Sequence, residues 1–407
     1  MVGRLSSLGC ALLGCALVGL ALAPQAGAQD VRLDPAAARL YGSADYLLWW
    51  MKGAPLSVPL VSTGPAANNE GFIFNSNTTI LYGAPFAPAV GGKSVQDFNG
   101  FSGGRLTLGY TLDPSRGIAV EASGFGLESR EAGYSAGGSP SLSGYGLRVP
   151  LYNAVPYFIG VPIDAIPSEN GLPVALPGRI GGQAAISNRL SLWGLDIAGT
   201  YELLRAPNWS VSGLAGLRYL DLAEDFDLTD FFYGTGGPFV GQSGTVRDHF
   251  GTRNRFIGPM LGVRGRAEWG PFSLTAQARV AVGDTMQELN VAGSFVASNY
   301  TPAFGAQGIF AQPANSGRRS SDHFAVQPEF QVKLGYDVTP NIRLTLGYDF
   351  LYLSNVVRPG DQLDRNLPKG QIFSQGGSAI SAAYPSKVFK TTDFYAQGLS
   401  AGVSFRF

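Results

Sequence analysis

Apolar and polar residues alternate with a period of two along most of the chain. Between Ile342 and Tyr352 every second residue is apolar, and the intervening positions include Arg343, Thr345, Gly347 and Asp349. Successive side chains of a strand point to opposite faces, so this pattern predicts a strand with one apolar and one polar face. A second alternating run over 330–336 precedes it across a short turn, and the two runs predict a hairpin.

The same alternation recurs along the chain, and no segment after residue 30 sustains a helical pattern. The alternating stretches are 46–50, 106–112, 118–122, 193–203, 211–219, 257–269, 272–280, 330–336, 342–352 and 395–407. Short turns alternate with long connections, which we place at 53–97, 130–186, 226–250, 293–322 and 355–392. A hidden strand near 145–159 would raise the strand number to twelve or more.

Strict alternation of short and long connections is typical of outer-membrane barrels, which have short periplasmic turns and longer outer loops. Among β structures, only closed sheets satisfy their backbone hydrogen bonds inside a bilayer. We therefore predict an all-β fold, a transmembrane antiparallel up-and-down β-barrel of about ten strands (ten to twelve). A soluble β-sandwich or β-helix also has alternating strands, but it does not require this order of connections.

The first 28 residues have the pattern of a secretory signal peptide. Arg4 precedes an apolar run over 5–23, and small residues lead to a cleavage site after Ala28. An uncleaved anchor and lipid attachment at Cys15 are the alternatives. We assign 1–28 to the signal peptide, 29–42 to a short periplasmic segment and 43–407 to a single outer-membrane barrel domain.

The end of the chain carries a second targeting pattern. Ser400, Gly402, Phe405 and Phe407 resemble the signal by which the barrel-assembly machinery recognises outer-membrane proteins. Together with the export signal, this ending predicts location in the cell outer membrane. The expected partners are outer-membrane lipid and the barrel-assembly machinery.

Charge is sparse and balanced. Charged residues make up 14% of the chain, with 29 basic and 29 acidic residues, against about 25% in soluble proteins. This composition argues against a cytosolic enzyme, and the zero net charge argues against nucleic acid as a partner. Aromatic residues make up 12%, and we expect those at strand ends to lie at the membrane–water boundary, Trp49 and Trp50 among them.

The charges on the polar strand faces are candidate lumen residues. They are Asp45, Arg105, Glu121, Asp196, Glu202, Arg218, Arg264, Arg266, Glu268, Arg279, Glu329, Lys333, Arg343, Asp349 and Arg406. Acidic and basic members nearly balance, so we expect them to pair across the interior and narrow or plug it. A barrel of eight strands is filled by its side chains, and open channels appear at about 16 strands.

Three segments resemble a known family. Residues 45–56 with 59–64, residues 250–258 with 261–262, and residues 105–110 are similar to segments of the beta-barrel porin-7 family of bacterial outer-membrane proteins. The chain departs from that family at Ile257, where an aromatic is usual, and at Pro259 and Met260, where Gly-Gln is usual. The resemblance implies a barrel fold and a porin function.

Catalytic and metal-binding patterns are weak. His249 and His323 each follow an aspartate, and an Asp-His pair at a barrel rim is what an omptin-like surface protease uses to activate water. Adjacent strand residues point to opposite faces, however, and no further acid pair can be located. Asp225, Asp227 and Asp230 lack the glycine and glutamate of a calcium-binding EF-hand loop. We expect no enzyme activity, cofactor or metal.

Three functions remain open from the sequence. The first is a porin-like barrel with a narrow or plugged lumen that passes small solutes by passive diffusion. The second is a structural or adhesive surface protein that acts through its long outer loops. The third is the omptin-like protease.

Overall fold

The computed structural model describes residues 39–66, 71–139, 144–155, 168–299, 304–368 and 384–407. The predicted signal peptide, with Ala28, lies outside the described residues. The first strand, β1, begins at Leu40, inside the segment assigned as periplasmic. No helix in the described part of the chain is both long and apolar enough to cross a membrane.

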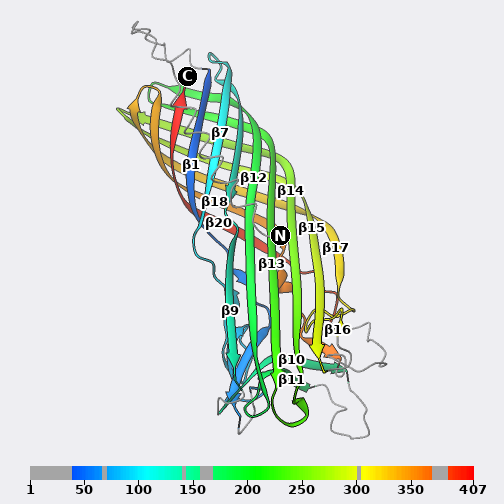
Figure 1. Cartoon of the computed structure of the whole chain (residues 1–407). Coiled ribbons are helices and arrows are strands. Elements are labelled where there is room, and N and C mark those ends of the chain that lie inside the picture. Colours follow the sequence, from blue (N-terminus) through cyan, green and yellow to red (C-terminus); the bar gives the residue numbers. More distant parts are fainter. Residues whose placement is uncertain (1–38, 67–70, 140–143, 156–167, 300–303, 369–383) are drawn as a thin grey trace.

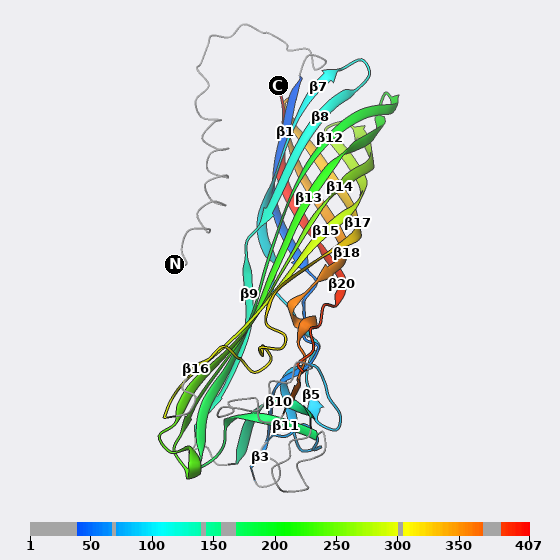
Figure 2. The ribbon, with the colours of Figure 1, turned by 90° about the vertical axis from the view of Figure 1, so that its right-hand side faces the viewer.

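Ten strands close into a ring (Figures 1 and 2). In ring order they are β1 (Leu40–Met51), β7 (Phe101–Asp113), β8 (Ile118–Leu127), β12 (Ile180–Ala206), β13 (Trp209–Gly234), β14 (Ser243–Trp269), β15 (Phe272–Ser298), β17 (Gly317–Thr339), β18 (Ile342–Val357) and β20 (Thr391–Arg406). Each neighbouring pair is antiparallel, and β20 pairs with β1 to close the ring. The all-β prediction is confirmed.

One end of the ring holds the beginning of β1 and the end of β20 (Figure 1). The short turns at 114–117, 207–208, 270–271 and 340–341 lie at this same end, because each joins two antiparallel neighbours there. We call this end the terminal mouth and the opposite end the far mouth. Ser400 and Gly402 of the predicted assembly signal pair with Leu47 and Asp45 of β1.

Four strands are far longer than a membrane requires. β12, β14 and β15 have 27 residues each and β13 has 26, whereas a bilayer is crossed by about 9–11 tilted residues. On β14 the outward positions from Val263 to Ile257 are apolar and exposed, and the next ones, Arg255 and Arg253, are charged. Inward positions change in the opposite sense, from Arg264 to Phe256 and Phe250.

The long strands therefore pass from lipid into water at the level of Ile257 and Arg255. In the ring the apolar face points outward and the polar face inward, as expected in lipid. Beyond it the polar face points outward and the apolar face inward, as in a soluble sheet. Outward aromatics mark both edges of the apolar band: Trp193 packs on Tyr219 at one edge, and Phe272 packs on Tyr336 at the other.

The strands beyond the band form a curved sheet, which we call the extension (Figure 2). It consists of the continuations of β12–β15 and β17, with β9 (Arg130–Gly138) paired to β12 and β16 (Phe304–Gly305) paired to β15. A smaller sheet shares an apolar core with the extension. Its strands are β3 (Pro59–Pro65), β4 (Thr79–Gly83), β5 (Val90–Gly91), β10 (Tyr145–Val155), β11 (Ser168–Ala175) and β19 (Asn366–Pro368). Two short strands, β2 (Ala54–Pro55) and β6 (Val95–Gln96), pair separately.

The core between the two sheets is apolar. Leu60, Val149 and Val174 from the smaller sheet join Phe226 and Phe250 from the extension in one buried cluster. Tyr82 of β4 stacks on Tyr134 of β9 with ring centroids 4.8 Å apart, and its hydroxyl accepts a hydrogen bond from Asn188. The described parts of the predicted loops 53–97 and 130–186 thus contribute most of the strands of a second sheet that packs on the extension.

Three expectations need correction. Residues 226–250 are mostly strand, because β13 and β14 continue past the band and leave only 235–242 between them; the 3-10 turn η2 (Gly237–Phe239) lies there. The strand found near 145–159 is β10, which pairs with β3, β11 and β19 outside the ring. Trp49 is fully buried inside the ring while Trp50 is exposed, because adjacent strand residues cannot both face outward.

Candidate functional site: the interior of the ring

Glu329 on β17 is the centre of a buried ion-pair cluster. Its carboxylate lies 3.2 Å from Arg105, 2.5 Å from Arg218 and 2.7 Å from Arg279. These guanidinium groups come from β7, β13 and β15, so the cluster crosses the interior. All four side chains are at most 9% exposed.

Two further aspartates complete this cluster. Asp196 accepts two hydrogen bonds from Arg218, at 2.6 and 2.7 Å, and one from Arg279 at 2.9 Å. Asp349 accepts one from Arg105 at 2.8 Å. Three arginines therefore face three carboxylates. Buried charges are tolerated when they are paired in this way, and removing one partner is costly. We call these six residues the ion-pair layer.

Aromatic rings cover the ion-pair layer on one side. The Arg105 guanidinium lies 5.5 Å from the ring centroids of both Trp49 and Phe125, and those rings lie 5.4 Å apart. Beyond them the interior is apolar, with a buried cluster that includes Leu47, Phe101, Leu192, Leu222, Phe256, Leu351 and Phe394. The interior is thus occupied by two successive layers, one charged and one apolar.

A loop after β18 packs beyond the apolar layer. Asn254 of β14 forms two hydrogen bonds with the backbone of Val357, and the 3-10 turn η3 (Pro359–Gln362) follows. Arg358 is fully buried, donates two hydrogen bonds to Glu224 at 2.7 and 2.8 Å, and donates to the carbonyls of Gly53 and Lys52. We call residues 356–363 the cap, because they tie β13, β14 and the chain after β1 together at the far mouth.

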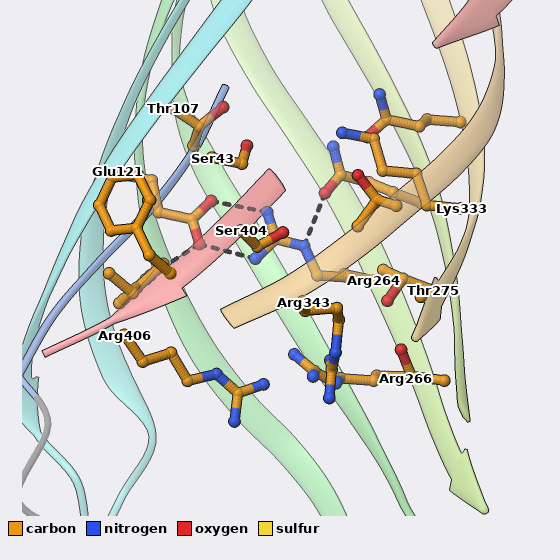
Figure 3. A pocket seen from close by; sticks show the side chains of 18 of the residues that line it. Ser43, Thr107, Glu121, Arg264, Arg266, Thr275, Lys333, Arg343, Ser404 and Arg406 are labelled. Atoms are coloured by element: carbon orange, nitrogen blue, oxygen red, sulfur yellow. Dashed lines mark hydrogen bonds and ion pairs between the residues drawn. The ribbon is translucent and has the colours of Figure 1, made fainter. Parts of the chain in front are cut away.

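On the other side of the ion-pair layer, a polar pocket opens at the terminal mouth (Figure 3). Its volume is about 200 Å³. Glu121 accepts two hydrogen bonds from Arg264, at 2.7 and 2.6 Å, and one from the Tyr41 hydroxyl. Lys333 donates to Asp45 at 2.8 Å. Tyr41, Glu121, Arg264 and Lys333 line the pocket.

The rim of the pocket is richer in positive charge. Arg343 donates to both oxygens of Asp337 and, at 3.3 Å, to Glu268. Arg266 donates to the same Glu268 oxygen at 2.8 Å. Arg406 also lines the pocket, and among the described residues it has no ion-pair partner.

Most of the predicted lumen charges are therefore brought together in the interior. Glu268 is half exposed at the end of β14, and Glu202 pairs with Arg205 beside the turn at 207–208, so these two belong to the rim. Glu224, Asp337 and Arg358 are not among the site residues predicted from the sequence. Arg358 and Asp337 lie in predicted connections, and Glu224 follows the point where the alternation changes phase. The lumen residues were predicted from the polar faces of the alternating strands, which include none of these three.

The predicted catalytic and calcium-binding residues do not converge. His249 faces outward on the extension, where its ring contacts Asp227 at 2.9 Å, whereas Asp248 points inward and is buried. His323 contacts the Ser321 hydroxyl. Asp230 is buried on the face opposite Asp225 and Asp227. Within the described residues, no group of three His, Cys, Asp or Glu side chains is placed to hold a metal ion.

Two aspartates are buried in the extension, and one of them, Asp248, anchors a loop. Asp248 accepts hydrogen bonds from the backbone N–H groups of Ile309, Phe310 and Ala311 at 2.6–3.0 Å. Burial raises the pKa of Asp248 to about 6, although these three donors oppose the change. Burial and the nearby Asp248 charge raise the pKa of Asp230 to about 8. Asp230 is thus predominantly protonated at neutral pH.

The closed ring, its outward apolar band and its charged interior define an outer-membrane β-barrel protein. A model of the beta barrel porin-7 family (BBP7) matches residues 41–407, and the chain belongs to that family. The predicted family and the location in the outer membrane are confirmed.

Solved structures that resemble the chain are also outer-membrane proteins. The outer membrane protease OmpT of Escherichia coli is 11% identical, with coverage of 91% of this chain and 97% of that one and a TM-score of 0.40. The outer membrane channel DcaP of Acinetobacter baumannii is 10% identical, with coverage of 91% and 97% and a TM-score of 0.15. At these scores the likeness carries no functional argument. No curated protein matches the chain.

Proposed function

We propose that this protein is a closed, ten-stranded, up-and-down transmembrane barrel that anchors a folded platform outside the cell. The platform is the extension with the smaller sheet. This is the structural or adhesive function that the sequence left open, and it replaces free diffusion of solutes through the lumen as the main role.

The observation that carries the proposal is the occupied interior. A freely conducting porin needs a continuous aqueous path, and the ion-pair layer, the apolar layer and the cap lie in succession across that path. The buried carboxylate of Glu329 with its three arginines cannot part without leaving unpaired charge in a medium of low dielectric constant, which is costly.

The direction of the barrel follows from the connections. In outer-membrane barrels the short turns lie on the periplasmic side, so the terminal mouth would face the periplasm and the extension the outside. The charged outward face of the extension, with Arg247, Arg253 and Glu288 among its residues, suits an aqueous surface.

Planar-bilayer recording tests whether the lumen is closed. We expect refolded residues 29–407 to show no conductance above that of the lipid alone. A double variant, Arg105→Ala with Glu329→Ala, removes a central pair of the ion-pair layer alone, and we expect it to stay closed as well, because the apolar layer and the cap still lie across the path. Steady single-channel conductance of the unmodified protein would overturn the closed barrel and restore the porin function.

Labelling of intact cells tests the direction. We expect Gln183→Cys on the extension to react with a membrane-impermeant maleimide, and Arg116→Cys in a short turn to react only after the outer membrane is permeabilised. Both positions are exposed, so they form a matched pair. The opposite result would invert the barrel and place the platform in the periplasm.

We also propose that the protein is not an enzyme. The position of His249 supports this: Asp248 points to the opposite face of the strand, and the aspartate that does contact His249, Asp227, lies with it on the outward face of the extension rather than in the interior of the ring. A peptide-cleavage assay checks it: activity in the unmodified protein that His249→Ala abolishes would contradict the proposal.

A further inference from the structure

Positive charge is in excess around the open part of the pocket at the terminal mouth. The cations that line the pocket are Arg105, Arg264, Arg266, Arg279, Lys333, Arg343 and Arg406, and the lining acids are Glu121 and Asp337. Arg105 and Arg279 belong to the ion-pair layer, and Arg264 and Lys333 are paired with Glu121 and Asp45. The excess therefore lies at the rim, on Arg266, Arg343 and Arg406.

Among the described residues, these three arginines have two carboxylates within ion-pair distance, those of Glu268 and Asp337. Arg266 and Arg343 both donate to the same oxygen of Glu268, at 2.8 and 3.3 Å, so their guanidinium groups lie close together. Arg406 repels Arg266 electrostatically. Asp337 accepts both of its hydrogen bonds from Arg343, and it attracts Arg266 only at longer range. Placing three arginines this close together costs free energy through their mutual repulsion. A bound anion would offset that cost.

The three arginine side chains also point into a pocket that has room for a small anion. Figure 3 shows the side chains of Arg266, Arg343 and Arg406 extending into one open space below the Glu121–Arg264 pair. Serine and threonine hydroxyls, those of Ser43, Thr107 and Ser404 among them, line the same pocket. Guanidinium groups present several N–H donors in a fixed plane, and this geometry matches the oxygen atoms of a phosphate group.

We propose that this pocket is an anion site that binds a phosphate group, with Arg266, Arg343 and Arg406 as its ligands. The site goes beyond the anchoring role proposed above and does not require the lumen to conduct. Two sources could supply the group, a soluble phosphate compound that enters from the mouth or the headgroup of a neighbouring phospholipid.

Arg406→Gln is the cleanest test of the site. Arg406 is exposed and unpaired among the described residues, so its loss leaves no buried carboxylate without a partner. Isothermal titration of inorganic phosphate into the refolded barrel in zwitterionic nanodiscs, at constant ionic strength, measures the affinity. A lost hydrogen bond to a charged group costs about 1.5–3 kcal/mol, so we expect Kd to rise at least about tenfold.

Two further variants separate binding from folding. Arg205→Gln lies at the same end of the ring but outside the pocket, paired with Glu202, and we expect it to leave the affinity unchanged. Asp337→Asn removes a carboxylate that competes for Arg343, and we expect it to tighten phosphate binding. A residue with a structural role alone would not give this opposite change.

The lipid arm identifies the source of the phosphate group. If headgroups occupy the site, nanodiscs of phosphatidylglycerol will weaken the binding of inorganic phosphate, and Arg406→Gln will remove that competition. If soluble phosphate is the ligand, binding in the two lipids will agree. Failure of phosphate to bind better than chloride in either lipid, or equal Kd values for the unmodified protein and Arg406→Gln, would overturn the site.

Discussion

Replacing Glu329 with glutamine tests whether the ion-pair layer holds the interior together. Three arginines converge on this carboxylate at 3.2, 2.5 and 2.7 Å, and Glu329 is 2% exposed at its side chain. Glutamine keeps the shape of the side chain but removes the charge. Arg105, Arg218 and Arg279 then share two carboxylates, those of Asp196 and Asp349, and one positive charge in the interior is uncompensated.

The expected loss of stability in Glu329→Gln follows from the burial of the ion pairs that Glu329 forms. Removing one partner of a buried ion pair typically costs 3–5 kcal/mol, and the remaining aspartates offset part of this. We therefore expect Glu329→Gln to lower the free energy of unfolding by roughly 3 kcal/mol. Glu131→Gln is the matched control, because its partner Arg189 is 56% exposed, and an exposed pair contributes about 0–1 kcal/mol.

Equilibrium unfolding in urea, with the barrel reconstituted in lipid vesicles, measures both variants. The double variant Glu329→Gln with Arg279→Gln restores the balance of two cations and two anions, so we expect it to recover part of the lost stability. Stability of Glu329→Gln within about 1 kcal/mol of the unmodified protein would refute the reasoning, since an interior that tolerates an unpaired charge contains water.

Two more predictions concern the extension and the cap. The pKa of Asp230 is raised to about 8, so the folded extension favours the protonated form, and its stability is fully present at pH values below the ordinary aspartate range and is lost as pH rises toward 8. We expect Asp230→Asn to flatten this decline, by up to about 1.4 kcal/mol per pH unit, in thermal unfolding followed from pH 4 to 9; an unchanged slope would contradict the buried, unpaired carboxyl. At the cap, Arg358→Met removes the partner of the buried Glu224, and we expect the cap to detach, so that Val356→Cys becomes reactive to maleimide in a protein whose residues 29–407 otherwise contain no cysteine. If Val356→Cys stays unreactive when it is combined with Arg358→Met, Arg358 does not hold the cap in place.

The ring could be predicted from the sequence because its pattern is dictated locally. A strand between lipid and a polar interior must alternate, so Leu261, Val263 and Arg264 already carry the information about which face is which. The short turns mark the strand ends, and the charges on the polar faces indicate the interior. Most of the candidate lumen charges lie there for this reason.

The extension was missed because the alternation changes phase rather than stopping. Around Tyr219 and Leu220 both faces are apolar, and beyond them the apolar residues occupy the positions that were polar before. A search for one continuous apolar face therefore ends at the band. The inverted pattern of Phe226 and Leu228 against Asp225 and Asp227 was present in the sequence, and it indicates a second solvent environment.

By itself the sequence determined the alternating strands, the order of short turns and the near balance of charges in the interior. Only the tertiary structure decided which charges meet: that Glu329 lies among three arginines, that Arg358 reaches Glu224, and that Arg266 and Arg343 share one oxygen of Glu268. The reason is physical. Alternation is set by the nearest neighbours along a strand, whereas ion pairs across a ring depend on the register of strands that are distant in the chain.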